Sequence, residues 1–200
     1  MLNAGGANMA KAESKNAVKT APKLERATFA SGCFWCIQPP FDRLKGVVST
    51  VVGYAGGHKK DPTYEEVSSG TTGHTESIEI FFDPAQVSFS ELLDLFWRNV
   101  DPTTNDRQFV DVGDQYRTAI FFHSEDQRKQ AVASKEKMER SGKFGDKPIV
   151  TEIMPASIFY PAEEYHQKYY QKNSMQYKFY RFNSGRDKYL EKTWGKHAKE

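Results

Sequence analysis

The stretch RATFASGCFWCIQPPFDRLKG, residues 26–46, holds both cysteines of this 200-residue chain and sets its first two elements. Residues 26–31 read as a short strand that leads into Cys33. Over residues 34–45 the apolar side chains recur at helical spacing, which predicts an α-helix. Pro39 and Pro40 are tolerated only near the start of a helix, so we expect either a kinked first turn that holds the cysteines or a regular helix that begins after them.

The rest of the chain continues this alternation of strands and helices. Strands are predicted over 47–54, 77–82, 116–123 and 149–154, and helices over 88–100 and 124–141, with Ser88 or Ser90 as the N-cap of the first. The order β-α-β-β-α-β-α-β predicts an α/β fold, an α+β sandwich of the ferredoxin-like plait type in which helices cover one sheet. Long loops that contain glycine, at 53–57, 69–74 and 101–115, are where we expect function to lie.

The two ends of the chain differ from its centre. Residues 1–26 hold five basic and two acidic side chains, and residues 176–200 hold seven and three, so the overall charge of +2 leaves −5 for the centre. We predict a disordered tail over 1–24 and one catalytic domain over 25–200, with a short helix after Pro161 and an irregular basic tail over 176–200. The acidic centre argues against a nucleic-acid-binding core.

No apolar stretch approaches the roughly 20 residues of a membrane helix, and the N-terminus has no signal-peptide core. We therefore expect no membrane association and favour the cytoplasm. An exported protein whose signal has been removed stays open. We also expect a monomer.

The chain has only two cysteines, Cys33 and Cys36, in a C-x-x-C pair. A disulfide framework needs more cysteines, and zinc needs two further ligands, so we expect neither a metal nor a cofactor. Cys33 stands where a strand gives way to a helix, and a helix N-terminus that faces its thiol would stabilise a thiolate. The alternative is a buried thiol that packs as a small apolar side chain.

The segments around these cysteines belong to a larger pattern that resembles the A-type peptide methionine sulfoxide reductase family over residues 26–182. The matching motifs are GCFWC at 32–36, VGYAGG at 52–57, DPTY at 61–64, EVSSG at 66–70, TGHTE at 72–76, DPTT at 101–104, DVGDQYR at 111–117 and YPAEEYHQ at 160–167. The resemblance implies reduction of methionine sulfoxide, of the S epimer, and recycling by thioredoxin or a similar dithiol donor.

The resemblance also implies a role for each matched side chain. Cys33 would attack the sulfoxide sulfur and become a sulfenic acid. Glu76 would protonate the sulfoxide oxygen, which requires burial to raise its pKa. Tyr64 and Tyr116 would hold that oxygen, Asp111 would orient the site, and Phe34 and Trp35 would receive the S-methyl group. Taken singly, Glu76 reads as a solvated residue, the tyrosines and Trp35 as core, and Asp111 as a loop cap. His58, His74 and His123 read as loop or surface residues without a catalytic role.

The chain departs from the family at two places. Many relatives have glycine at position 36 and recycle through cysteines near the C-terminus, whereas here Cys36 is the only other thiol. Cys36 is therefore expected to resolve the sulfenic acid, provided that Cys33 is the N-cap or the first helical turn is deformed, because thiols inside a regular helix lie too far apart. Secondly, Phe109 and Val110 stand where relatives often carry Gly-Asn, which affects the shape of the loop before Asp111.

Two other functions are compatible with the cysteine pair alone. A general thiol–disulfide oxidoreductase would use Cys33 and Cys36 but leave Tyr64, Glu76 and Tyr116 idle. An aromatic module that binds methionine-rich or methylated ligands would leave Cys33 dispensable.

Overall fold

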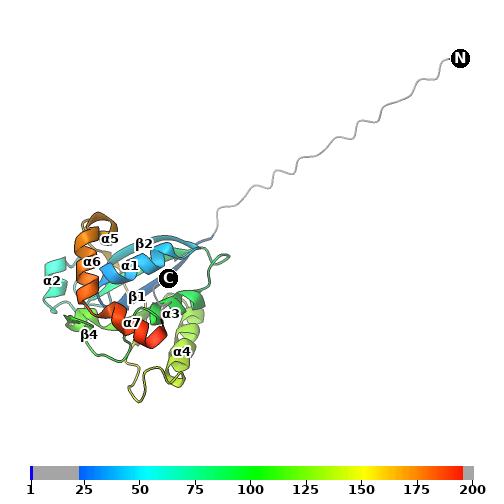
Figure 1. Cartoon of the computed structure of the whole chain (residues 1–200). Coiled ribbons are helices and arrows are strands. Elements are labelled where there is room, and N and C mark those ends of the chain that lie inside the picture. Colours follow the sequence, from blue (N-terminus) through cyan, green and yellow to red (C-terminus); the bar gives the residue numbers. More distant parts are fainter. Residues whose placement is uncertain (2–22, 196–200) are drawn as a thin grey trace.

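The segment around Cys33 forms the first strand and the first helix of the fold, seen in a computed structural model that describes residue 1 and residues 23–195 (Figure 1). The tail predicted over 1–24 thus lies almost wholly outside the described residues. The elements in chain order are β1 (Glu25–Ser31), α1 (Phe34–Arg43), β2 (Val47–Ala55), α2 (Tyr64–Ser68), β3 (Thr75–Phe82), α3 (Phe89–Trp97), β4 (Arg107–Gln108), β5 (Asp111–Val112), a 3₁₀ turn (Asp114–Tyr116), β6 (Thr118–Phe122), α4 (Glu125–Arg140), β7 (Glu152–Pro155), β8 (Tyr160–Pro161), α5 (Tyr169–Lys172), α6 (Ser174–Asn183) and α7 (Arg186–Trp194).

One six-stranded sheet organises these elements, in the order β7-β6-β1-β3-β2-β8. Its four central strands are antiparallel and alternate with α1 and α3 as β-α-β-β-α-β, so the predicted plait is confirmed. At one edge β7 adds in parallel to β6, and at the other β8 pairs with β2. Within residues 23–195, no helix is long and apolar enough to cross a membrane.

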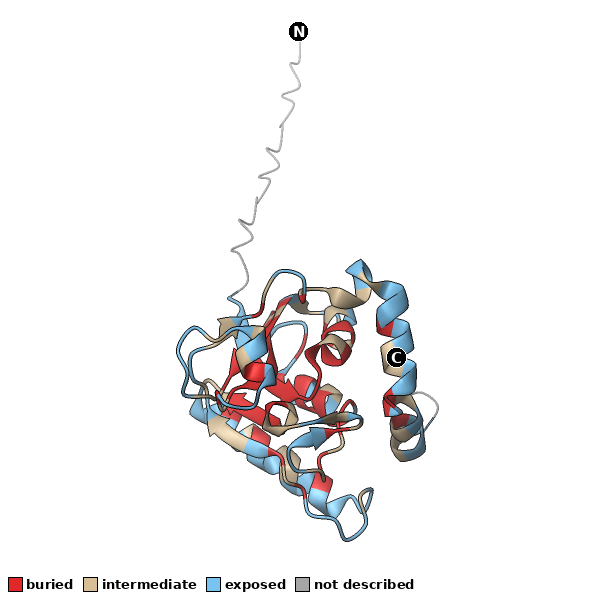
Figure 2. Ribbon diagram, turned by 90° about the vertical axis from the view of Figure 1, so that its left-hand side faces the viewer, coloured by how far each residue is buried: buried red, intermediate tan, exposed pale blue. Residues whose placement is uncertain are grey.

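The main core lies between the sheet and helices α1 and α3. Phe29 of β1 stacks on Phe41 of α1 and on Phe89 and Phe96 of α3, with ring centroids 5.2–6.0 Å apart. Figure 2 shows the central strands and the inner sides of these helices as buried. Burial of such aromatic side chains contributes about 1.5–3 kcal/mol each, which holds α1, and the cysteines at its start, against the sheet.

The predicted helix starts follow local hydrogen-bonding chemistry. Ser88 is the N-cap of α3 and forms a reciprocal capping box with Glu91. Helix α1 begins at Phe34, directly after Cys33, and contains both Pro39 and Pro40. Its first turn is tightened by a hydrogen bond from the Cys36 N–H to the Cys33 carbonyl, 3.0 Å, which is an i to i−3 contact.

The prediction was wrong for the C-terminal segment. The irregular tail expected over 176–200 is instead helix α6, a turn at Gly185 in the left-handed region, and helix α7, up to Gly195. Residues 196–200 lie outside the described part. Figure 1 shows α5 and α6, in orange, beside α1, and α7, in red, next to α3. The smaller difference is at Tyr116, which lies in the 3₁₀ turn before β6 rather than in the strand.

Candidate active site

A cavity of about 80 Å³ opens at the start of helix α1. Its lining residues are Cys33, Phe34, Trp35, Tyr64, Glu76, Asp111, Tyr116 and Tyr180. Seven of these eight were candidates from the sequence, although they come from five separate segments of the chain. Tyr180 was not among them, and Cys36 does not line the cavity.

Backbone geometry places Cys33 at the mouth of this cavity. Cys33 is the N-cap of α1 and is 6% exposed. Gly32 before it adopts φ +73°, and a Cβ at that position would lie 2.4 Å from the Cβ of Gln108. Glycine is therefore required for both the left-handed turn and the close approach of the loop before Asp111.

Glu76 enters the cavity from the first residues of strand β3. Its side chain is buried, and Oε2 accepts a hydrogen bond from the backbone N–H of Phe34 at 3.0 Å. Burial is the main cause that raises the pKa of this carboxyl to about 8, nearby Asp111 contributes to the increase, and the Phe34 N–H opposes it. Glu76 is thus largely protonated near neutral pH and can donate a proton.

The Cys33 thiol has a different environment from the one predicted. The first N–H of α1 is occupied by Glu76, and the side chain of Cys33 makes no capping hydrogen bond. Burial raises the pKa of Cys33 well above its ordinary value, as do its hydrogen bond with Cys36 and the nearby carboxyls of Glu76 and Asp111. The expectation that the helix N-terminus stabilises a Cys33 thiolate is therefore wrong for the substrate-free protein.

Two phenols face Glu76 across the cavity. Tyr64 is the first residue of the short helix α2, which Thr63 and Glu66 cap reciprocally, and its N–H donates to Glu163 at 2.9 Å. Burial raises the pKa of both Tyr64 and Tyr116, and the carboxyl of Glu76 adds to each shift. Both hydroxyls therefore stay protonated and are available as hydrogen-bond donors.

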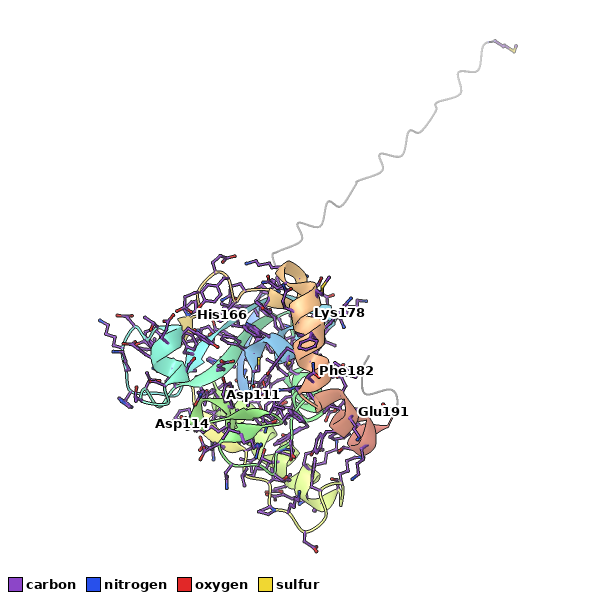
Figure 3. All side chains as sticks on the ribbon, turned by 60° about the vertical axis from the view of Figure 1, so that its left-hand side comes forward. Asp111, Asp114, His166, Lys178, Phe182 and Glu191 are labelled. Atoms are coloured by element: carbon purple, nitrogen blue, oxygen red, sulfur yellow. The ribbon has the colours of Figure 1, made fainter. Side chains whose placement is uncertain are left out.

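Phe34 and Trp35 form an apolar wall that is held rigidly. The Trp35 indole N–H donates to Nδ1 of His166 at 3.0 Å, and its ring stacks on Tyr169 with centroids 3.9 Å apart. Because an indole N–H can only donate, Nδ1 of His166 carries no proton and the imidazole is neutral. His166, labelled in Figure 3, was quoted within a sequence motif but had been given no role.

Tyr180 ties the C-terminal helices to the site. Its hydroxyl, on helix α6, donates at 2.5 Å to Oδ2 of Asp111, which lies on the ribbon formed by β4 and β5. Burial raises the pKa of Asp111, and the hydrogen bond from Tyr180 opposes this. Sequence reasoning missed Tyr180 because it placed this segment in an irregular tail.

The second cysteine lies inside the protein. Cys36 is 0% exposed, and both thiols are reduced. Cys33 is the N-cap of α1, which is the position that the sequence analysis requires of it for a disulfide with Cys36.

The other histidines have structural surroundings. His74 is buried rather than on the surface, and it accepts from the Gly57 N–H at 3.0 Å and bonds the Lys59 carbonyl at 2.7 Å, which links two loops. His123 bonds Thr28 at 2.9 Å at the other end of the sheet. Among residues 23–195 there is no cluster of three or more His, Cys, Asp or Glu side chains that could hold a metal ion.

Comparison with known proteins gives one consistent result. Residues 25–198 match the peptide methionine sulfoxide reductase family. The peptide methionine sulfoxide reductase MsrA of Halalkalibacterium halodurans is 55% identical over 174 residues, which are 87% of this chain and 98% of that protein. The crystal structure of reduced Mxr1 from Saccharomyces cerevisiae superposes with a TM-score of 0.71 at 38% identity, over 76% of this chain and 87% of that one. The crystal structure of Mxr1 from Saccharomyces cerevisiae in complex with Trx2 superposes with a TM-score of 0.53 at 30% identity, over 77% of this chain and 91% of that one.

Proposed function

We propose that Cys33 is the nucleophile of this chain, which belongs to the peptide methionine sulfoxide reductase family and reduces methionine sulfoxide to methionine. One observation supports the assignment above all: Cys33, the protonated Glu76 and two phenols line a single small cavity beside an apolar wall. A general thiol–disulfide oxidoreductase has no use for this set, and the family does not favour it.

The substrate fits the cavity by its chemistry. The S-methyl group rests against Phe34 and Trp35, because aromatic rings make favourable contacts with sulfur and its methyl group. The sulfoxide oxygen then meets the donors Glu76, Tyr64 and Tyr116. Since the sulfur is chiral and both its methyl and its oxygen have assigned places, only one epimer presents the sulfur to Cys33. By family resemblance this is the S epimer.

Proton transfer accompanies the attack. As Sγ of Cys33 bonds to the sulfoxide sulfur, Glu76 gives its proton to the oxygen, and the proton lost by Cys33 replaces it. The hydroxyl then passes from the substrate sulfur to Sγ of Cys33 as both the S–O bond and the new bond between the two sulfurs break, so methionine leaves and Cys33 becomes a sulfenic acid. Because the resting Cys33 is a thiol, the protonation of the oxygen and the loss of the thiol proton are coupled. Asp111, held by Tyr180, orients these groups and does not touch the oxygen.

Cys36 completes the turnover as the resolving thiol. Its thiolate attacks Sγ of the Cys33 sulfenic acid, the hydroxyl leaves as water after gaining a proton, and a Cys33–Cys36 disulfide forms. A dithiol donor of the thioredoxin type then reduces this disulfide, as the complex of the relative Mxr1 with Trx2 suggests. Such a cycle suits a compartment that keeps thiols reduced, so we propose a cytoplasmic location. We further propose that the protein is a monomer and that it repairs oxidised proteins.

The test supplies each epimer of methionine sulfoxide with dithiothreitol and quantifies methionine for the wild type, Cys33→Ser and Cys36→Ser. We expect turnover of one epimer by the wild type and none by Cys33→Ser. With one equivalent of substrate and no reductant, the wild type should form one methionine and lose both thiols, whereas Cys36→Ser should form one methionine and retain a sulfenic acid. Turnover by Cys33→Ser at the wild-type rate would refute the assignment.

A further inference from the structure

The two cysteines differ in access to solvent. Cys33 lines the cavity, whereas Cys36 does not line it and is fully buried. A reductant that enters through the cavity therefore reaches Cys33 first.

Helix α6 places a guanidinium against Cys36. Pro40 has no N–H, so the Cys36 carbonyl has no donor within α1. Nη1 of Arg181 occupies this position and donates to that carbonyl at 3.1 Å. Arg181 is held in turn by Asp187 at 2.9 Å.

Helix α7 supplies a second cation. Arg186 is 1% exposed, donates to the Asn99 carbonyl at 2.6 Å and lies over the ring of Phe109 at 4.4 Å. It forms no salt bridge within the described residues, and its Nε has no hydrogen-bond partner there. A buried cation without a paired anion is costly, so the site favours a negative charge nearby.

The charges around Cys36 come from every element packed against it. The groups that interact with it are Cys33 before α1, Glu76 on β3, Asp111 on β5, Tyr177, Tyr180 and Arg181 on α6, and Arg186 on α7. In the reduced protein, the hydrogen bond with Cys33 and the cations Arg186 and Arg181 together lower the pKa of Cys36 to about 7, against the opposing effect of burial. The pKa of Cys33 is shifted in the opposite direction.

We propose that the dithiol donor attacks Sγ of Cys33 in the oxidised enzyme, and that Cys36 leaves as a thiolate stabilised by the positioning residues Arg181 and Arg186. The thiol with the lower pKa leaves a disulfide faster. In this step the donor thiolate bonds to Cys33, the Cys33–Cys36 bond breaks, and its electron pair stays on Cys36. The second thiol of the donor then displaces Cys33, which takes up a proton, so the donor dithiol becomes a disulfide and both enzyme thiols are regenerated.

This inference rests on the resolving role proposed for Cys36, and the experiment separates the two. The wild-type enzyme is oxidised with methionine sulfoxide, and loss of both free thiols is measured first. A thioredoxin variant that keeps only its attacking cysteine is then added, and the reaction is quenched early with acid and N-ethylmaleimide. The tryptic peptide of residues 27–43 holds both cysteines, and fragmentation between Phe34 and Trp35 assigns the two labels.

The expected product carries the donor on Cys33 and maleimide on Cys36. Donor on Cys36, or equal amounts on both cysteines, overturns the proposal and leaves the resolving role intact. Failure to lose two thiols before the donor is added overturns the resolving role and this proposal together.

Arg181 allows the electrostatic part to be measured separately. In the reduced protein, the ultraviolet absorbance of thiolates against pH reports the titration of Cys36. Arg181→Gln should move the first midpoint up by about one unit, at the low end of the effect of an adjacent opposite charge. Arg181→Lys should bring the midpoint part of the way back to the wild-type value. Arg140→Gln, on the exposed face of α4, should leave the midpoint unchanged. An unchanged midpoint in Arg181→Gln, with the fold retained by circular dichroism, overturns the role of Arg181.

Discussion

Replacement of Glu76 by glutamine removes the proton that the mechanism needs and keeps the shape of the side chain. In the wild type the pKa of about 8 leaves Glu76 mostly protonated at pH 7, and the acid is lost as the pH rises through 8. We therefore expect the wild-type rate of methionine formation to fall about tenfold per pH unit above that point. Glu76→Gln should be slower at pH 7 but should lack this alkaline limb. Glu76→Ala should lose two to four decades, or about 3–5 kcal/mol of transition-state stabilisation.

The same substitution has a stability signature. The folded pKa of about 8 lies above the ordinary value of 4.5, so between these values the folded protein binds the extra proton. Stability from this group is therefore complete below pH 4.5 and is lost as the pH rises toward 8, by at most about 5 kcal/mol. Glutamine does not titrate. The unfolding free energy of Glu76→Gln, relative to that of the wild type, should therefore increase as the pH rises from 5 to 9.

The assay measures initial rates of methionine release from the reactive epimer with saturating dithiothreitol, from pH 5.5 to 9.5. Glu79→Gln is the matched control, because Glu79 lies on the same strand but on the opposite face, where it pairs with Arg26. Its pH–rate profile should follow that of the wild type. If Glu76→Gln keeps the alkaline limb, a different group protonates the oxygen and the role of Glu76 is wrong.

Three further predictions concern the remaining groups. Tyr180→Phe removes the 2.5 Å hydrogen bond to Asp111, and we expect kcat/KM to fall about three- to tenfold, the value of one such bond, which steady-state kinetics would measure. It should also raise the pKa of Asp111, because that hydrogen bond opposes the upward shift; an unchanged Asp111 carboxyl resonance in an NMR titration would contradict this. Phe29→Ala should lower the free energy of unfolding by about 3–5 kcal/mol, measured by denaturant unfolding, because the ring contacts both α1 and α3. A loss below about 1 kcal/mol would show that the core collapses into the space left by the ring.

Local sequence features were sufficient for most elements of the fold. The N-cap of α3 at Ser88 and the helical spacing of the apolar side chains in α1 each act within a few residues, so their effect can be read without the rest of the chain. The same holds for most of the cavity lining, although for a different reason: its residues stand in motifs that resemble a known family.

The C-terminal helices escaped prediction because their apolar side chains face outward. Met175, Phe179 and Phe182 of α6 are exposed. Tyr180 instead donates to Asp111, and Arg181 donates to the Cys36 carbonyl. Helix α6 turns polar side chains toward the protein and apolar ones toward solvent, which is the reverse of an amphipathic helix that packs on a core. The spacing of its apolar residues therefore does not predict a helix.

The amino-acid sequence by itself determined which side chains could react: one C-x-x-C pair, one acid at position 76 and the tyrosines around them. Only the tertiary structure decided their protonation. The Phe34 N–H at the start of α1 is bound to Glu76 and not to the Cys33 thiol. The cations of α6 and α7, Arg181 and Arg186, act on Cys36. Burial and the distance between charges set a pKa. Both arise here from contacts between residues 42 and 145 positions apart, which no local pattern encodes.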